Sequence, residues 1–204
     1  MKRVRPMIVV ATGNAGKARE IAAALKGVPL RIAGLADLGG PADYEETGLS
    51  FAANARGKAA FYSARTGLLT LAEDSGLMVE ALGGAPGVVS ARFAGPGADD
   101  ARNNRKLLRL LAGVPPGRRT ARFVCCMVLA RDGRRIKQVT GRVRGRILER
   151  GRGGFGFGYD PLFFYPGFGR TFGELSPDEK NSVSHRGRAI RAMAAFITAH
   201  LREF

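Results

Sequence analysis

The sequence lacks any long apolar run. Among its 204 residues, no apolar stretch approaches the roughly 20 residues that a membrane-spanning helix needs, and the basic start of the chain leads into only a short apolar segment. These absences exclude integral membrane functions, and we expect a cytoplasmic protein. The sequence also lacks repeats, low-complexity segments and linkers, so we expect a single domain over residues 1–204.

Cysteine is scarce. The two cysteines, Cys125 and Cys126, are adjacent in an apolar stretch, whereas a redox pair or a zinc knuckle needs cysteines that are separated by spacer residues. We therefore predict buried free thiols in a reducing compartment.

Acidic residues are also few. Only 17 Asp and Glu stand against 33 Lys and Arg, which gives a formal net charge of +16. Such a surface attracts anions, either nucleic acid or a nucleoside polyphosphate, unless the charge reflects compositional bias alone. Because the basic residues are scattered along the chain and not gathered in one stripe or tail, we favour a small anionic substrate and do not expect nucleic acid as the partner.

Two adjacent carboxylates follow the apolar run at 68–72. They are Glu73 and Asp74, and Ser75 comes next. We predict that a buried strand ends here and delivers both carboxylates to a sheet edge, where ligands of open α/β sheets bind. At about 4 Å and an effective dielectric of about 20, two like charges repel by about 4 kcal/mol, so a divalent cation or a raised pKa is needed. The site is either half of a metal site or a solvated strand-to-turn corner.

A strand, a glycine loop and a helix are expected at the start of the chain. The continuous apolar run at 7–11 predicts a buried strand, and periodic apolar residues after the loop predict a helix. The loop consists of Thr12, Gly13, Asn14, Ala15, Gly16 and Lys17. Backbone N–H groups at a helix start, with a lysine in the first turn, are typical of a phosphate site. A Walker A loop is excluded by Ala11 and Ala18, and a plain glycine turn is the alternative.

Other elements complete an α/β pattern. A helix is expected over 51–66 with Lys58 on its inward face, where a lysine either meets an anion or snorkels at the edge of the core. Two long strands are expected over 119–131 and 134–146, and Asp132-Gly133 between them is typical of a β-hairpin, so the sheet should be mixed. Further predictions are a second strand over 30–35, an amphipathic helix over 99–111, a strand over 160–165, a helical turn from Ser176 and a last helix from 184.

Seven short motifs occur in a fixed order. They are Thr12-Gly13-Asn14 with Lys17, Glu45-Glu46-Thr47-Gly48, Asn54 with Lys58, Glu73-Asp74-Ser75-Gly76, Gly83-Gly84-Ala85-Pro86-Gly87, Gly158-Tyr159-Asp160-Pro161 and Ser184-His185-Arg186-Gly187. In order and spacing the chain resembles the non-canonical purine nucleoside triphosphate pyrophosphatases, the inosine triphosphatase, Ham1 or RdgB-like family. The resemblance implies a mixed, twisted sheet flanked by helices, in two lobes with an active-site cleft between them. It also implies a homodimer that uses one or more Mg²⁺ ions per subunit to hydrolyse ITP, dITP and XTP to the monophosphate and pyrophosphate, and so cleanses the nucleotide pool.

The resemblance also implies residue roles. Asp74 is the proton acceptor and, with Glu45, a magnesium ligand; Glu73 stands where many members have aspartate and is a further candidate. The implied substrate-binding residues are Thr12, Gly13, Asn14, Ala15, Gly16, Lys17, Lys58, Ser75, Phe157, Gly158, Tyr159, Asp160, Lys180, His185 and Arg186. Phe155 is the alternative to Phe157 as the stacking residue, and we choose Phe157 because it directly precedes Gly158.

Base choice depends on hydrogen bonds. Donors from His185 and Arg186 suit the oxygen at C6 of hypoxanthine or xanthine and oppose the amino group of adenine. Two other functions remain open at this point. One is a Maf-like pyrophosphatase that acts on pyrimidine or modified triphosphates, and the other is a basic nucleic-acid-binding module, against which the carboxylates argue.

Overall fold

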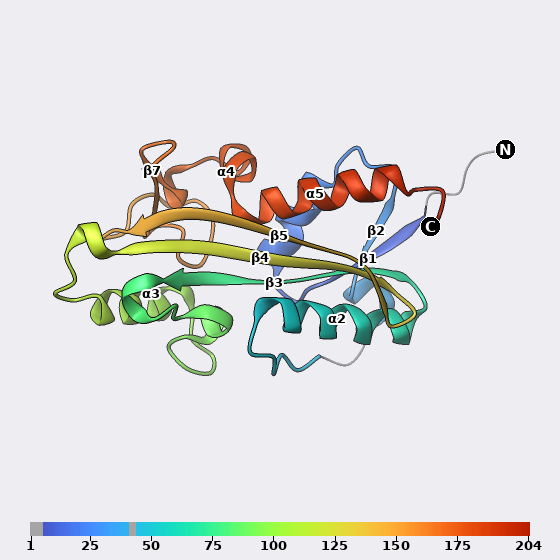
Figure 1. The fold of residues 1–204 in the computed structure, drawn as a ribbon, viewed down its shortest axis with the longest axis horizontal. Coiled ribbons are helices and arrows are strands. Elements are labelled where there is room, and N and C mark those ends of the chain that lie inside the picture. Colours follow the sequence, from blue (N-terminus) through green and yellow to red (C-terminus); the bar gives the residue numbers. More distant parts are fainter. Residues whose placement is uncertain (1–5, 41–43) are drawn as a thin grey trace. The chain divides into compact units, whose positions relative to one another are not determined.

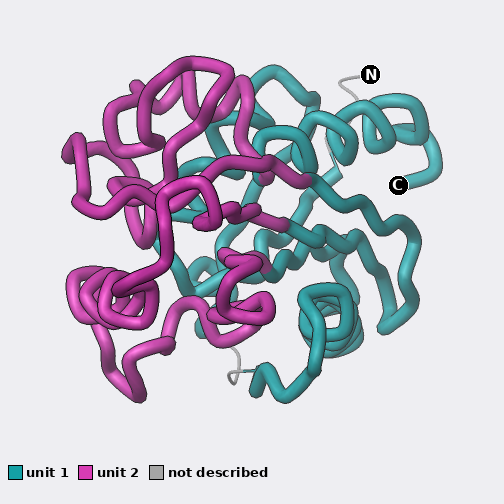
Figure 2. The backbone as a smooth tube through the Cα atoms, turned by 60° about the vertical axis from the view of Figure 1, so that its left-hand side comes forward, with its two compact units in different colours: residues 1–74, 125–141, 186–204 teal, residues 75–124, 142–185 magenta. Residues whose placement is uncertain are grey.

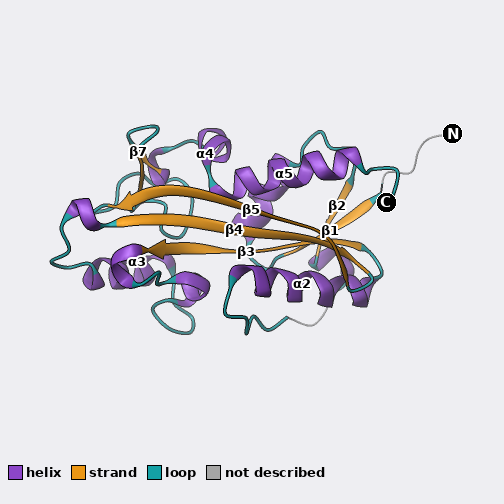
Figure 3. Ribbon diagram, viewed as in Figure 1, coloured by secondary structure: helices purple, strands orange, loops and turns teal. Residues whose placement is uncertain are grey.

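A computed structural model of the protein describes residues 6–40 and 44–204. The strands are β1 (Met7–Ala11), β2 (Arg31–Gly34), β3 (Leu69–Val79), β4 (Thr120–Arg131), β5 (Arg134–Ile147), β6 (Phe163–Tyr165) and β7 (Arg170–Thr171), and the helices are α1 (Ala15–Ala24), α2 (Phe51–Thr66), α3 (Asp100–Leu110), α4 (Pro177–Val183) and α5 (His185–Ala199). The strands form one sheet in the order β2-β1-β3-β4-β5-β6-β7 (Figure 3).

The sheet is mixed, as predicted. β1 pairs in parallel with β2 and β3, whereas β5 with β6 and β6 with β7 are antiparallel. The α/β fold class is therefore confirmed. In the described part of the chain, no helix combines the length and the apolar character that crossing a membrane requires.

The chain divides into two compact units, which Figure 2 distinguishes by colour. The first unit comprises Met1–Asp74, Cys125–Gly141 and Arg186–Phe204, and the second comprises Ser75–Val124 and Arg142–His185. Each unit has its own cluster of buried apolar side chains. The single domain over 1–204 stays a prediction.

In the first unit, helices lie on both faces of the strands, with α5 and α2 on opposite faces (Figure 1). Alternation along a strand decides which side chain meets which helix. Leu69 and Leu71 of β3 join the cluster that Ile21 of α1 and Ile190 of α5 also enter. Thr70, which lies between them in the strand, points to the opposite face of the sheet and therefore faces α2. The predicted strand at 7–11 and helix at 51–66 have these bounds in the structure.

One prediction about β3 is wrong. The strand does not end at residue 72, because β3 continues through Glu73 and Asp74 to Val79. The two carboxylates are 1% and 4% exposed, so they lie inside the sheet and not at its edge. Polar partners from other elements hold them there, as described below. Because successive side chains of a strand point to opposite faces, Glu73 follows Leu71 towards α1 and α5, while Asp74 faces α2.

In the second unit, the ends of β3, β4 and β5 pack with α3 around an aromatic cluster. The rings of Phe123, Phe163 and Phe172 are in mutual contact, with centroids 4.7–6.1 Å apart. The strand predicted over 160–165 is shorter than expected and begins at Phe163. The carbonyl oxygen of Tyr159 accepts hydrogen bonds from the N–H groups of residues 162 and 163, which makes a turn of this segment.

Local signals for caps and turns are confirmed. Ser176 with Glu179 forms the capping box of α4, where a helical turn is predicted, and α3 with its N-cap Asp99 lies within the predicted range 99–111. Asp132 and Gly133, which join β4 to β5, both have positive φ, as the tight turn of a hairpin requires. The predicted strand at 30–35 spans Arg31–Gly34.

Candidate active site

The loop between β1 and α1 presents a helix N-terminus. Asn14 is the N-cap of α1, and its side-chain oxygen accepts a hydrogen bond from the Lys17 N–H at 3.0 Å. The Thr12 hydroxyl accepts one from the Asn14 N–H at 3.2 Å. Residues 13–15 are exposed at the start of α1. The predicted phosphate loop is thus ordered by its own side chains.

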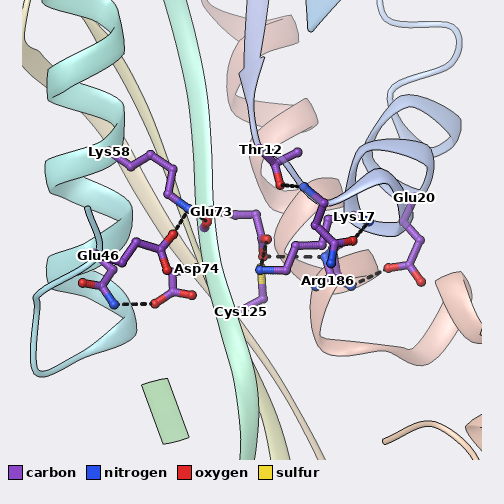
Figure 4. Close-up of polar contacts among 11 residues, drawn as sticks. Thr12, Lys17, Glu20, Glu46, Lys58, Glu73, Asp74, Cys125 and Arg186 are labelled. Carbon is purple, nitrogen blue, oxygen red and sulfur yellow. Dashed lines mark hydrogen bonds and ion pairs between the residues drawn. The ribbon is translucent and has the colours of Figure 1, made fainter. Parts of the chain in front are cut away.

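Glu73 is the centre of a buried ion-pair network in the first unit (Figure 4). Lys17 Nζ lies 2.7 Å from Glu73 Oε1, and Arg186 Nε lies 3.6 Å from Glu73 Oε2. Arg186 Nη1 also pairs with Glu20 Oε2 at 2.5 Å. Burial alone would raise the pKa of Glu73, but Lys17 and Arg186 outweigh it and hold this pKa well below its usual range. Glu73 is therefore ionised throughout the physiological pH range.

The same network raises the pKa values of two of its members, Lys17 and Cys125. Burial would lower the pKa of Lys17, but the Glu73 carboxylate raises it, so the amine stays charged. The Cys125 thiol donates to Glu73 Oε2 at 3.3 Å, and burial together with Glu73 raises the pKa of this thiol. Cys125 and Cys126 are both free and buried, as predicted. Cys125 therefore acts as a neutral donor in this network.

Asp74 has different surroundings on the other face of β3. Asn54 of α2 donates from Nδ2 to Asp74 Oδ2 at 2.9 Å. Burial raises the pKa of Asp74 to about 6; the Glu46 carboxylate adds to the rise, and the hydrogen bond from Asn54 opposes it. A carboxylate with such a pKa is a competent proton acceptor near neutral pH.

The acidic loop before α2 is tied to this carboxylate. Asn54 Oδ1 accepts a hydrogen bond from the Gly48 N–H at 2.7 Å, so one buried amide connects the loop with Asp74. Glu46 forms an ion pair with Lys58, which also donates to the Glu73 backbone oxygen at 3.2 Å. Lys58 thus meets an anion, as one of the two sequence interpretations predicts. Glu45 is exposed on the same loop.

Carboxylates that could hold a metal are sparse. Among the residues that the structure describes, no group of three or more His, Cys, Asp or Glu side chains is placed to hold a metal ion. Asp74 and the loop with Glu45 and Glu46 supply oxygen donors on one face of β3. Glu73 points to the other face and is neutralised by two cations, so the structure does not bring it together with Asp74.

The second unit holds the remaining predicted residues, around the loop 157–160. The Asp160 carboxylate, 2% exposed, accepts from Lys180 Nζ at 2.5 Å and from the Phe157 N–H at 2.9 Å. The Lys180 amine also lies 4.7 Å from the centroid of the Phe157 ring. Phe157 is partly buried, whereas Phe155 is 58% exposed. His185 is buried, and its ring stacks on Phe123 at 4.7 Å.

Several of these contacts were not apparent from the sequence. In the sequence Glu46 resembles an ordinary acidic residue of a loop. The ion pair of Glu20 could not be predicted, because its partner Arg186 lies 166 residues away in the chain. Asn54 precedes Lys58 by one helical turn, and this spacing places both on the buried face of α2. Arg186, an implied substrate contact, is 2% exposed and engaged by Glu20 and Glu73.

Comparisons with known proteins agree on one family. A model described as the Ham1 family matches residues 8–196. A dITP/XTP pyrophosphatase of Desulforamulus reducens is 49% identical over 184 residues, which cover 90% of this chain and 92% of that protein. One of Geobacillus kaustophilus is 50% identical over 183 residues, 90% of each. Among solved structures, a HAM1 protein from Coxiella burnetii has a TM-score of 0.87 at 38% identity, over 95% of this chain and 99% of that one.

Proposed function

Because the chain belongs to the Ham1 family, we propose that it hydrolyses non-canonical purine nucleoside triphosphates, dITP, XTP and ITP, to the monophosphate and pyrophosphate. The relatives cited above are named dITP/XTP pyrophosphatases at about half identity over nine-tenths of the chain. The observation in the structure that carries the proposal is Asp74, a buried carboxylate whose pKa is raised to about 6. The enzyme would remove such nucleotides from the pool. A Maf-like activity on pyrimidine nucleotides and a nucleic-acid-binding module are not favoured.

The chemistry is attack of water on the α-phosphorus. The new bond joins the water oxygen to this phosphorus, and the bond from the α-phosphorus to the bridging oxygen of the β-phosphate breaks. Asp74 accepts the proton of the water, and pyrophosphate leaves with the bridging oxygen. Lys17, Lys58 and the N-terminus of α1 offset the negative charge of the phosphates. The resemblance adds Ser75, the residue after Asp74, as a substrate contact.

The donor set fits Mg²⁺. This ion prefers oxygen ligands, keeps several waters and is usually bound by one or two carboxylates together with substrate phosphates, so a larger protein cage is not needed. We assign Asp74 and Glu45 to it, because Glu46 of the same loop is engaged by Lys58. Glu73 is assigned no part in metal binding. When bound, Mg²⁺ neutralises and orients the phosphates.

The base is assigned to residues of the second unit. Phe157 offers a ring for stacking, and Gly158, Tyr159 and Asp160 continue the same loop. Lys180 is buried against Asp160, and His185 is the proposed donor to the oxygen at C6. Arg186 retains its implied substrate role as a proposal, although Glu20 and Glu73 already engage its guanidinium. A homodimer, as the family resemblance implies, completes the proposal, together with action in the cytoplasm and no nucleic-acid partner, as the composition and the charge distribution of the sequence predict.

A nucleotide panel tests the proposal. Purified protein with Mg²⁺ is incubated with dITP, XTP, ITP, dGTP, ATP and dCTP, and both products are identified. We expect dITP, XTP and ITP to be converted to monophosphate and pyrophosphate much faster than ATP. Equal turnover of ATP, or orthophosphate as the first product, would refute the assignment, and a preference for dCTP would establish the pyrimidine alternative.

A further inference from the structure

The loop that carries Phe157 is clamped by helix α3 at a single residue. Asp100 Oδ2 accepts a hydrogen bond from the Gly158 N–H at 2.6 Å. Asn104 Nδ2 donates to the Gly158 carbonyl oxygen at 2.9 Å. Both backbone polar groups of Gly158 are therefore bound by side chains from one helix.

The spacing on α3 makes this clamp. Asp100 is the first residue of α3 and Asn104 lies one turn later, so the two side chains share a helix face. The carboxylate of Asp100 is an acceptor and the amide of Asn104 is a donor, so together they match the N–H and the C=O of Gly158. Gly158 has a φ of +64°, a conformation that favours glycine.

The helix is itself a fixed platform. Leu107 and Leu111 are fully buried in the core of the second unit. Asn103 accepts a hydrogen bond from the Ala94 N–H at 2.8 Å and donates to the Ala91 carbonyl oxygen at 3.0 Å. Helix α3, which carries both clamp residues, is therefore held in place by packing and by hydrogen bonds of its side chains.

The rest of the loop is anchored to other segments. The Tyr159 hydroxyl donates to the Ser90 carbonyl oxygen at 2.8 Å, and Asp160 is held by Lys180. The Phe157 N–H donates to the Asp160 carboxylate at 2.9 Å, and the next residue, Gly158, is bound to α3, so the backbone is held on both sides of Phe157. The direction of the ring depends on this attachment.

We propose that Asp100 and Asn104 are positioning residues that hold the loop 157–160 in the geometry that binds the purine base. The inference deepens the proposed function and rests on it, because it takes the base as the ligand of this loop. Neither residue needs to touch the nucleotide. Since the reacting bond is at the α-phosphate, base contacts are the same in the ground state and the transition state, so their loss should raise KM and leave kcat nearly unchanged.

The test compares Asp100→Ala and Asn104→Ala with two controls. Asp100→Asn keeps an oxygen that accepts from the Gly158 N–H, and Arg105→Ala changes the exposed residue that directly follows Asn104. We expect KM for dITP to rise about tenfold in each alanine variant, with kcat within about twofold of the starting protein. Asp100→Asn and Arg105→Ala should retain the original KM. Inhibition by pyrophosphate, which has no base, should be unchanged in all four.

The outcomes separate the two levels of inference. If the starting protein does not hydrolyse dITP, the proposed function fails. If it does, and both alanine variants keep its KM, the clamp has no positioning role. An equal weakening of pyrophosphate inhibition would overturn the inference too, because the effect would not be confined to the base. Thermal melting verifies that each variant folds. Asp100→Ala and Asn104→Ala each remove a different hydrogen bond to Gly158, so if one variant does not fold, the other still tests the clamp.

Discussion

Replacement of Glu73 by glutamine should destabilise the protein strongly. Glutamine has nearly the same size and shape, so the substitution removes a charge without opening a cavity. The side chain is fully buried, and both Lys17 and Arg186 depend on it. The variant Glu73→Gln therefore leaves two cations close together beside β3 without the carboxylate that separates them.

The expected loss is about 3–5 kcal/mol of unfolding free energy, the usual cost of removing one partner of a buried ion pair. The lower end of this range applies because Glu20 still pairs with Arg186 at 2.5 Å. The pH dependence has a defined sign. Because the folded-state pKa of Glu73 is lowered, its stabilisation is fully present above the unfolded-state value of about 4.3 and is lost as the pH falls below it. The difference between the two proteins should thus be largest at neutral pH.

Urea unfolding measures this difference. Far-UV circular dichroism is the suitable signal, because the chain has no tryptophan, and urea leaves the ionic strength low. Glu149→Gln is the matched control: its carboxylate is 66% exposed and lies 3.5 Å from Arg119, so its loss should cost less than about 1 kcal/mol. If Glu73→Gln costs no more than this control at pH 7, the buried network does not stabilise the fold as argued.

Three further predictions concern the face of β3 that carries Asp74. Burial raises the pKa of Asp74 to about 6, so kcat/KM should fall tenfold per pH unit below this value at limiting Mg²⁺, and saturating Mg²⁺ should shift this acidic limb of the pH profile to lower pH. The variant Asp74→Asn should bind nucleotide yet lose orders of magnitude in kcat, and near-normal turnover would contradict Asp74 as the proton acceptor. Glu45→Gln should raise the Mg²⁺ concentration that gives half-maximal activity by at least about tenfold, whereas Glu46→Gln should change it less; the reverse order would make Glu46 the metal ligand.

The parts of the fold that follow from local signals could be predicted from the sequence. Continuous apolar character predicts the strand at 7–11, and the helical spacing of inward-facing residues predicts the helix at 51–66; both have these bounds in the structure. The same holds for the hairpin turn at Asp132-Gly133, which requires a backbone conformation that few residues adopt.

The course of β3 could not be predicted in this way. Two carboxylates after an apolar run are typical of a strand end, because buried charges are costly unless they are paired. Their partners come from distant segments: Lys17 from α1, Asn54 from α2 and Arg186 from α5. No local pattern shows that these cations and amides converge on residues 73 and 74. The sequence pattern therefore predicts a strand end at a point where β3 continues.

The alternation of β3 gives two adjacent acids opposite properties. Glu73 is surrounded by cations and stays ionised, whereas Asp74 meets an amide and a like charge and titrates near neutral pH. Glutamate at position 73 is longer than aspartate, and its side chain extends from β3 to both Lys17 and Arg186. Lys17 belongs to the proposed phosphate loop, so the anion that fixes this lysine is adjacent in the chain to Asp74, the proposed proton acceptor. A change in the register of β3 by one residue would exchange the two environments and abolish both functions at once.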